Sequence, residues 1–259
     1  MKLICPVCHT PLESSEHSVC CVNRHSFDYA RSGYLNLLNR PAPGAGDNAG
    51  MVQARTAFLS TGAYAFLKEE IIKILKEEPV EVFVDLGCGE GTYTSGCPGK
   101  EKYGFDLSKQ AINYAAKHDK TTQYAVASIF HLPLENACAD AVLTCFAPVA
   151  GEEIARITVP GGRFVLVSPG EMHLYEMKQV LYDAPYKNEL SSPSIAGMEK
   201  EKELQIEQKF SVDHSSLQSL IQMTPYAYHT GKEGLARLSQ VEQMELTASF
   251  QLQVFRRHY

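Results

Sequence analysis

Residues 80 to 92 read Val-Glu-Val-Phe-Val-Asp-Leu-Gly-Cys-Gly-Glu-Gly-Thr, and they decide the fold of the chain. Apolar residues come first, and the run then breaks into glycines at alternate positions, Gly87, Gly89 and Gly91. This pattern predicts a β-strand that enters a tight loop and is followed by a helix. A glycine has no side chain to hold a ligand away from the backbone, and it tolerates positive φ, so we expect the loop to bind a ligand. The alternative is a tight turn that binds nothing.

Two aspartates around this loop indicate which ligand it binds. The dinucleotide fingerprint is G-x-G-x-x-G, whereas this chain has D-x-G-x-G-x-G from Asp85 to Gly91. Asp85 is expected either to fix the loop or to attract a cationic or hydroxyl-bearing ligand. Asp106 follows it by 21 positions, at the end of the next predicted strand, and suits the ribose hydroxyls of a nucleoside cofactor. The combination resembles the first two motifs of the class I S-adenosylmethionine-dependent methyltransferases.

The composition is that of a soluble globular protein. The chain has 259 residues, 44% of them hydrophobic and 21% charged, so it can hold one large α/β domain and a small appendage. It has no membrane-length apolar run and no signal peptide, so we expect a cytosolic location and no membrane partner. There, eight cysteines are expected to bind metal or be buried rather than form disulfides. The net charge of −6 argues against a uniformly basic nucleic-acid binder and leaves a local basic face open.

The first 40 residues differ from the rest in carrying a metal-binding pattern. Cys5 and Cys8 form a C-x2-C knuckle, and Cys21 with His25 forms a C-x3-H pair. Zinc binds four such donors in a tetrahedron, and two short pairs supply two donors each. A segment of this size has little core of its own, so we expect the metal to supply much of its folding free energy. Cys20 is the alternative partner of His25, although the spacing favours Cys21.

Several features of the N-terminal region have two interpretations. The cysteines are zinc ligands or free thiols, and His9 and His17 are spare ligands or solvated side chains. The basic residues contact nucleic acid or form an ordinary solvated surface; they are Lys2, Arg24, Arg31 and Arg40. Residues 33–38, Gly-Tyr-Leu-Asn-Leu-Leu, are expected to pack around the knuckle or to dock it on the main domain. Residues 41–50, rich in Pro and Gly, are expected to be a linker.

Downstream, the chain alternates helices and strands. We predict helices over 51–60, 63–77, 151–158, 171–182 and 214–221. Two more are expected, one that begins near Ser108 as its N-cap and one after Gly231. We predict further strands over 102–106, 123–127, 140–146, 163–168, 204–212 and 245–256, a turn over 160–162 and a polar insertion over 185–202. Such alternation implies a parallel sheet with helices on both faces. Ligands then lie beyond the carboxyl ends of the strands, where Asp85, Asp106, Ser128 and residues 146–148 are expected.

Together, the two parts of the chain resemble one family, the bacterial 23S rRNA (guanine-N1-)-methyltransferases of the RlmA type. The resemblance extends nearly end to end, and a zinc knuckle fused to such a core is more specific than either part. The matching motifs are Cys5-Cys8-Cys21-His25, Gly33-Tyr34-Leu35-Asn36-Leu37-Leu38, Gln53-Ala54-Arg55, Asp85-Leu86-Gly87-Cys88-Gly89-Glu90-Gly91, Pro169-Gly170-Glu171-Met172-His173-Leu174 and Gln222-Met223-Thr224-Pro225-Tyr226.

The resemblance implies a fold, a reaction and a set of residues. It implies a zinc-binding RNA-recognition module over 1–40, the linker over 41–50 and a class I methyltransferase domain with a Rossmann-like α/β core over 51–259. It implies methyl transfer from S-adenosylmethionine to N1 of a guanine in hairpin 35 of 23S rRNA, by a homodimer. The implied zinc ligands are Cys5, Cys8, Cys21 and His25. The implied cofactor contacts are Tyr64, Gly87, Gly89, Glu90, Asp106 and His173. Without the resemblance, Tyr64 and His173 have a second interpretation as structural core residues.

The chemistry leaves the catalytic base open. Guanine N1 must lose a proton before or during attack, and no residue is uniquely suited to take it. The target base must be splayed into the pocket, and we expect it to stack on an aromatic ring such as that of Phe146. Two other hypotheses are a methyltransferase acting on a small molecule or protein, favoured by the negative net charge, and an RNA-binding module without catalysis.

Overall fold

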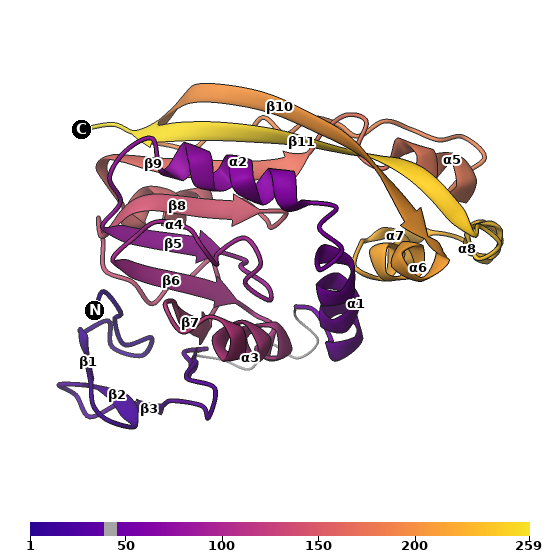
Figure 1. Cartoon of the computed structure of the whole chain (residues 1–259). Helices are drawn as coiled ribbons and strands as arrows, with labels where there is room; N and C mark the ends of the chain where they lie inside the picture. The colour runs from indigo at the N-terminus through magenta and orange to yellow at the C-terminus, as the bar shows by residue number, and fades with distance from the viewer. Residues whose placement is uncertain (39–45) are drawn as a thin grey trace.

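The computed structural model describes residues 1–38 and 46–259 (Figure 1). Its helices are α1 (Ala49–Leu59), α2 (Ala65–Leu75), α3 (Lys109–His118), α4 (Gly151–Ile157), α5 (Tyr175–Leu181), α6 (His214–Gln222), α7 (Tyr226–His229) and α8 (Lys232–Leu238). Its strands are β1 (Leu12–Ser14), β2 (Ser18–Cys21), β3 (Ser26–Asp28), β4 (Leu35–Asn36), β5 (Val82–Leu86), β6 (Glu101–Asp106), β7 (Gln123–Val126), β8 (Ala139–Cys145), β9 (Thr158–Pro169), β10 (Met198–Asp213) and β11 (Gln243–Arg257). Among these described residues, no helix combines the length and apolarity that a bilayer crossing requires.

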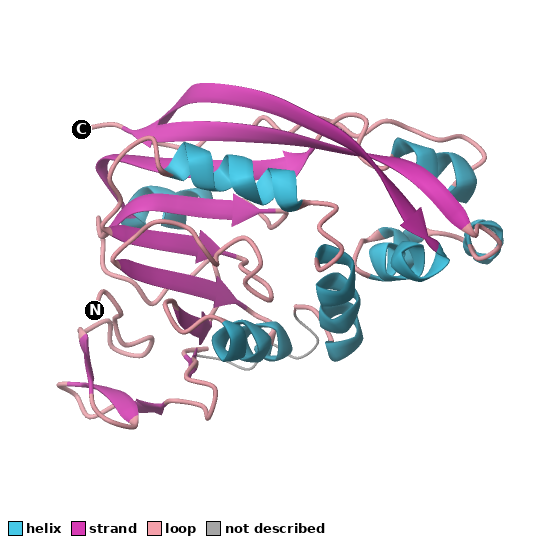
Figure 2. Ribbon diagram, viewed as in Figure 1, coloured by secondary structure: helices cyan, strands magenta, loops and turns pink. Residues whose placement is uncertain are grey.

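An eight-stranded mixed sheet forms the centre of the molecule, in the order β10-β11-β9-β8-β5-β6-β7-β4. The strands from β4 to β9 run parallel, as the alternation of strands and helices predicts. Strand β11 runs in the opposite direction, because it pairs antiparallel with both of its neighbours, β9 and β10. This corrects the expectation of a wholly parallel sheet. Figure 2 shows β10 and β11 extending past the other strands toward α6, α7 and α8, which connect them in the chain.

The sheet buries side chains on both faces. Phe83 of β5 packs with the apolar side of α2, which includes Leu67 and Ile71. Val82 and Val84, on the opposite face of the same strand, pack in the cluster that contains the buried residues of α4. The predicted covering of both faces is thus confirmed, and it leaves the carboxyl ends of the strands as an edge. Helix α1 lies beyond this edge (Figure 1) and contacts α3 and α6.

The N-terminal region is joined to the sheet rather than separate from it. β4 adds to the sheet edge by pairing with β7, and the backbone N–H of Ile4 donates to Pro133 (2.9 Å). Leu3 and Cys5 lie in the same apolar cluster as the sheet residues of one face. The docking role expected for residues 33–38 is therefore observed. Of the expected linker, residues 41–45 lie outside the described residues, and α1 already begins at Ala49.

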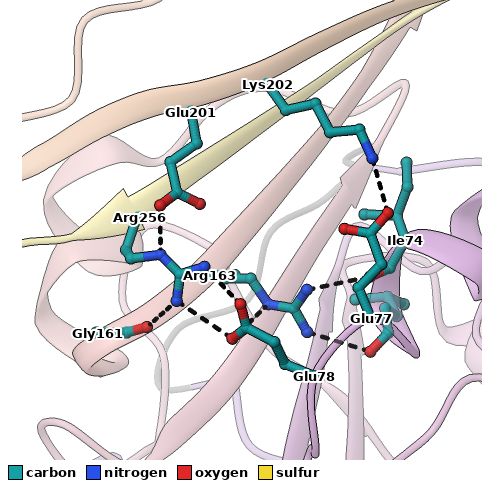
Figure 3. Close-up of polar contacts among 9 residues, drawn as sticks. Ile74, Glu77, Glu78, Gly161, Arg163, Glu201, Lys202 and Arg256 are labelled. Atoms are coloured by element: carbon teal, nitrogen blue, oxygen red, sulfur yellow. Dashed lines mark hydrogen bonds and ion pairs between the residues drawn. The ribbon is translucent and has the colours of Figure 1, made fainter.

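A buried arginine fixes the end of α2 (Figure 3). Arg163 on β9 is 4% exposed and donates to the carbonyls of Ile74 (3.1 Å) and Leu75 (3.2 Å), at the carboxyl end of the helix. Glu78 lies 3.5 Å from the Arg163 guanidinium and also accepts a 2.6 Å hydrogen bond from Arg256 of β11. Because last-turn carbonyls attract cations, this contact ties α2 to β9 and β11.

Three local predictions are wrong, each for a physical reason. No helix follows the glycine loop, since residues 90–96 form successive turns in which Gly91 and Gly96 have positive φ. The turn expected over 160–162 lies inside β9, where Gly161 (φ +76°) allows the strand to bulge between the pairs made by Ala139 and Ala141 of β8. Residues 198–202 belong to β10 rather than to the polar insertion, because they pair with β11.

Candidate cofactor site and zinc centre

The glycine loop is held by the neighbouring strand. The backbone N–H groups of Gly87 and Cys88 both donate to the carbonyl of Phe105, at 2.8 and 3.0 Å. A Cβ on Gly87 would lie 2.4 Å from the Cβ of Ala147, and one on Gly91 would lie 2.8 Å from the Tyr124 hydroxyl. A side chain at either position would clash with protein atoms, so packing within the protein also requires these two glycines. That the loop makes room for a ligand stays a prediction.

Gly89 differs from the other two loop glycines. Its φ is +55°, and the nearest atom to an added Cβ would be Nη1 of Arg55, at 3.4 Å. Its N–H donates to Oδ2 of Asp106 (3.0 Å), and Oδ1 of Asp106 accepts from the N–H of Ser108 (2.7 Å). Burial raises the pKa of Asp106 above its ordinary value. The structure thus brings together the loop and the aspartate that sequence spacing paired.

Asp85 fixes the loop from inside the protein. Its side chain is fully buried, and Oδ2 accepts a 2.6 Å hydrogen bond from the Thr94 hydroxyl. Burial raises the pKa of Asp85 to about 7. Oδ1 of Asp85 has no hydrogen-bond partner among the described residues, and neither has the buried hydroxyl of Tyr93. Unpaired buried polar atoms are costly, and a bound ligand can satisfy them.

Two residues that were not predicted as part of the site, Arg55 and Asp47, form an ion-pair cluster with Glu90 against the loop. Arg55 of α1 pairs with the Asp47 carboxylate, and its Nη1 lies 3.6 Å from the carboxylate of Glu90, which is buried. The backbone carbonyl of Asp47 accepts a 2.6 Å hydrogen bond from the hydroxyl of Ser108. Sequence spacing gave Arg55 no role in the site, although it lies in the Gln-Ala-Arg motif that carried the family resemblance.

Tyr64 and His173 meet although they are 109 residues apart. Nδ1 of His173 accepts from the N–H of Ser249 (3.3 Å), so the proton resides on Nε2, which donates to the Tyr64 hydroxyl at 3.4 Å. Burial lowers the pKa of His173 to about 3, so the ring is neutral. Both rings pack on Phe250, with centroids at 5.0 and 4.8 Å.

Phe250 connects this pair to the glycine loop through further aromatic rings. Its centroid is 5.5 Å from that of Phe146, which in turn is 6.1 Å from that of Tyr93. Phe146 follows β8, is 44% exposed and has a φ of +59°. That conformation is unfavourable for a bulky residue, so the surrounding structure holds the ring where it is. Ring contacts therefore link Tyr64 and His173, through Phe250 and Phe146, to Tyr93, which follows the glycine loop.

S-adenosylmethionine fits this donor set. Asp106 at the end of β6 can accept hydrogen bonds from ribose hydroxyls. The carboxylates of Glu90 and Asp106 favour a cationic ligand, and Asp85 and Tyr93 offer unpaired polar atoms. When bound, the cofactor supplies a methyl group on a sulfonium. The chain's residues bind it, orient it and exclude water.

The four predicted zinc ligands converge. Their donor atoms, Sγ of Cys5, Cys8 and Cys21 and a ring nitrogen of His25, lie within 4.8 Å of one another. Nδ1 of His25 is 3.5 Å from Sγ of Cys5 and 3.4 Å from Sγ of Cys21, while the Sγ atoms of Cys8 and Cys21 are 3.6 Å apart. A tetrahedral zinc ion has S···N edges of about 3.5 Å and S···S edges of about 3.8 Å, so the arrangement fits zinc.

The structure also decides between the alternative ligands. The Sγ atom of Cys20 contacts the hydroxyls of Ser18 (3.7 Å) and Ser26 (3.4 Å) and is not part of the metal-binding group. Cys21 is therefore the partner of His25, as the spacing favours. His9 and His17 also lie outside the group, and His17 is exposed beside Glu16.

Comparisons with known proteins agree with both sites. The family model described as "RlmA, N-terminal" matches residues 3–41, and the model described as "Methyltransferase domain" matches residues 84–166. A 23S rRNA (guanine(748)-N(1))-methyltransferase of Streptomyces fradiae is 32% identical over 268 residues, covering 96% of this chain and 95% of the relative. A Bacillus subtilis (strain 168) protein, provisionally named a 23S rRNA (guanine-N(1)-)-methyltransferase, is 27% identical over 94% of this chain and 93% of its own. A malonyl-acyl-carrier protein O-methyltransferase of Hahella chejuensis is 31% identical over 49% of this chain and 50% of its own.

The fold and the two sites define a class I S-adenosylmethionine-dependent methyltransferase with an N-terminal zinc ribbon. Near-full-length similarity narrows this class further. The chain belongs to the 23S rRNA (guanine-N1-)-methyltransferases of the RlmA type.

Proposed function

We propose that this protein transfers the methyl group of S-adenosylmethionine to N1 of a guanine in hairpin 35 of 23S rRNA. The observation that carries the proposal is the 32% identity, over 95% of its length, to a relative named for guanine N1 of 23S rRNA. The fused zinc ribbon supports it, because that module matches the RlmA N-terminal family and the Hahella O-methyltransferase shares only half of the chain.

The cofactor contacts form part of the same proposal. Gly89 and Glu90 at the loop, Asp106 at the end of β6 and the Tyr64–His173 pair surround the cofactor. Gly87 contributes by letting the loop pack against Ala147. Methyl transfer is an in-line displacement, so alignment of the two reactants supplies much of the rate enhancement. No catalytic base for guanine N1 is assigned.

Phe146 is the residue proposed to hold the target base. Its ring is part exposed and lies between Phe250 and Tyr93, beside the glycine loop. A guanine splayed from its RNA helix can stack on such a ring, which places N1 near the methyl group.

We assign RNA recognition to the zinc module of residues 1–40 and catalysis to the domain of residues 51–259. Residues 41–50 are the linker between them. Arg24 and Arg31 are exposed on the module and supply positive charge for RNA phosphates. A homodimer with two such modules, and a cytosolic location where ribosomal RNA is modified, complete the proposal.

Primer extension on 23S rRNA tests the function. N1-methylguanine cannot form its Watson–Crick pair, so reverse transcriptase stops beside it. RNA from the wild-type strain is expected to give a stop in hairpin 35, which disappears on gene deletion and returns on complementation. The position equivalent to 748, after the name of the Streptomyces relative, is examined first. A stop that persists in the deletion strain would rule out this activity, and methylation of metabolites by the purified protein would then favour a small-molecule substrate.

A further inference from the structure

Arg55 brings a positive charge to a loop surrounded by acids. The side chain extends from α1 to the glycine loop, where Nη1 lies 3.4 Å from the position of a Cβ on Gly89. It is 24% exposed and pairs with Asp47 and, at 3.6 Å, with Glu90. Asp106 is close enough for the guanidinium to lower its pKa against the effect of burial. Packing does not require a cation here, since α1 buries Val52, Ala54 and Phe58 instead.

The charges of the cofactor explain why a cation belongs at this position. S-adenosylmethionine carries a sulfonium, an ammonium and a carboxylate. The two cationic groups suit a site that contains Asp47, Asp85, Glu90 and Asp106. The carboxylate would be repelled by the same acids unless a positive group met it. A guanidinium binds a carboxylate through two parallel N–H···O bonds, which fixes both position and orientation.

We propose that Arg55 binds the carboxylate at the methionyl end of the cofactor, and that Asp47 occupies the guanidinium in its absence. The inference rests on the proposed function, because it takes the bound ligand to be S-adenosylmethionine. Asp47 is suited to this exchange because it is anchored nearby through its backbone, where its carbonyl accepts from Ser108. Its carboxylate can therefore leave Arg55 while the segment stays in place. Glu90 remains beside the guanidinium and limits its movement.

Calorimetry with two ligands tests the assignment. S-adenosylhomocysteine keeps the carboxylate, and its decarboxylated analogue, 5′-deoxy-5′-(3-aminopropylthio)adenosine, lacks only that group. Arg55→Met in the full-length protein is expected to weaken S-adenosylhomocysteine binding by about 10- to 100-fold, the effect of losing a charged hydrogen-bonded pair. The affinity for the analogue is expected to change by less than about threefold, since no carboxylate is lost. Arg55→Lys keeps the charge without the fork and should fall between wild type and Arg55→Met.

Asp47→Asn is the matched control. It removes the competing carboxylate and keeps the backbone carbonyl, so S-adenosylhomocysteine should bind as tightly as to wild type or more tightly. Equal losses for both ligands in Arg55→Met, or an equal loss in Asp47→Asn, would show that the ion pair only supports the fold of the site and would overturn the inference. If wild-type protein bound neither ligand, the proposed function would fail, and the inference with it.

Discussion

Gly87 and Ala147 pack so closely that any side chain on the glycine would displace the alanine, since a Cβ would lie 2.4 Å from that of Ala147. The positive φ of Gly87 (+74°) adds strain for any other residue. Gly87→Ala is therefore expected to lower the free energy of unfolding by about 3 kcal/mol, through overpacking together with left-handed backbone. Urea unfolding followed by circular dichroism measures this loss.

Gly89→Ala provides the comparison within the same loop. Its Cβ would meet only Nη1 of Arg55, at 3.4 Å, so the cost is that of the backbone conformation, about 1–2 kcal/mol. The added methyl group is expected to weaken S-adenosylhomocysteine binding by at least about tenfold, because it faces the region of Arg55 and Asp106. Similar stability losses in the two variants would contradict the distinct roles of these glycines.

Loss of a zinc ligand should unfold the module and spare the core. Cys5→Ala leaves three of the four converging donors, so zinc should be released and residues 1–34 should lose protection from hydrogen exchange. The sheet that carries the cofactor site has its own buried clusters, so S-adenosylhomocysteine should still bind. Atomic absorption and hydrogen exchange measure the two effects. Methylation of ribosomal RNA should fall far more than cofactor affinity.

Cys20→Ala is the control for this experiment. Its thiol contacts the hydroxyls of Ser18 and Ser26 and lies outside the metal group, so zinc content and RNA methylation should match wild type. If Cys5→Ala also methylated RNA normally, the module would not recognise the substrate. Equal zinc loss in both variants would contradict the ligand set.

Local chemistry explains why part of this structure was predictable from the sequence. Ser108 was expected to cap a helix, and its hydroxyl accepts from the N–H of Ala111 at the start of α3. The zinc ligands and the D-x-G-x-G-x-G loop are likewise set by spacing over a few residues. Pairing of β9 with β11 joins segments about 80 residues apart, and no local pattern encodes its direction.

The parts of the site that sequence missed depend on tertiary contacts. The role of Gly87 follows from its contact with Ala147, which lies in the loop after β8. The position of Arg55 at the loop follows from the placement of α1 beyond the sheet edge, and an arginine on a predicted helix has no signature of its own. The helix predicted after the loop follows from the usual strand-loop-helix order, but Gly91 and Gly96 favour turns there.

Protonation of His173 should make the protein sensitive to mild acid. Its pKa is about 3 in the folded protein, against 6.5 for an ordinary histidine, because the ring is buried. Below pH 6.5, His173 therefore binds a proton in the unfolded chain but not in the folded protein. The free energy of unfolding is therefore unaffected by this group above pH 6.5, and it falls by about 1.4 kcal/mol per pH unit as the pH is lowered toward 3. Urea unfolding at pH 7 and pH 5 measures the difference.

His173→Gln removes the titrating imidazole and keeps a hydrogen-bond acceptor for the N–H of Ser249. The variant should be less stable than wild type at pH 7, and it should lose about 2 kcal/mol less between pH 6.5 and 5. The zinc ligands titrate alike in both proteins, so they cancel from the comparison. Parallel pH profiles would show that His173 is not buried in its neutral form.

Arg163 is expected to be the more important of the two arginines at the end of α2. Arg163→Met leaves the carbonyls of Ile74 and Leu75 without their buried donor, and should cost about 2–4 kcal/mol of unfolding free energy. Arg256→Met removes an arginine that is 27% exposed, and should cost about 1 kcal/mol or less. Both lie at the edge of the sheet where the parallel strands begin, away from the cofactor site, so cofactor affinity should not change. Equal destabilisation by the two variants would contradict the capping role of Arg163.

Phe146 offers a test of base stacking that is separate from cofactor binding. Phe146→Leu keeps an apolar contact with Phe250 and removes the aromatic face, so kcat/KM for an rRNA fragment should fall about 5- to 100-fold, the value of one stacked base. Phe146→Tyr keeps the ring and should retain most of the activity. S-adenosylhomocysteine affinity, measured by calorimetry, should be the same in both variants, because the cofactor contacts lie on the loop, β6 and the Tyr64–His173 pair. A leucine variant that methylates at the wild-type rate would place the target guanine elsewhere, whereas parallel losses of RNA methylation and cofactor affinity would mean that the left-handed residue only supports the loop.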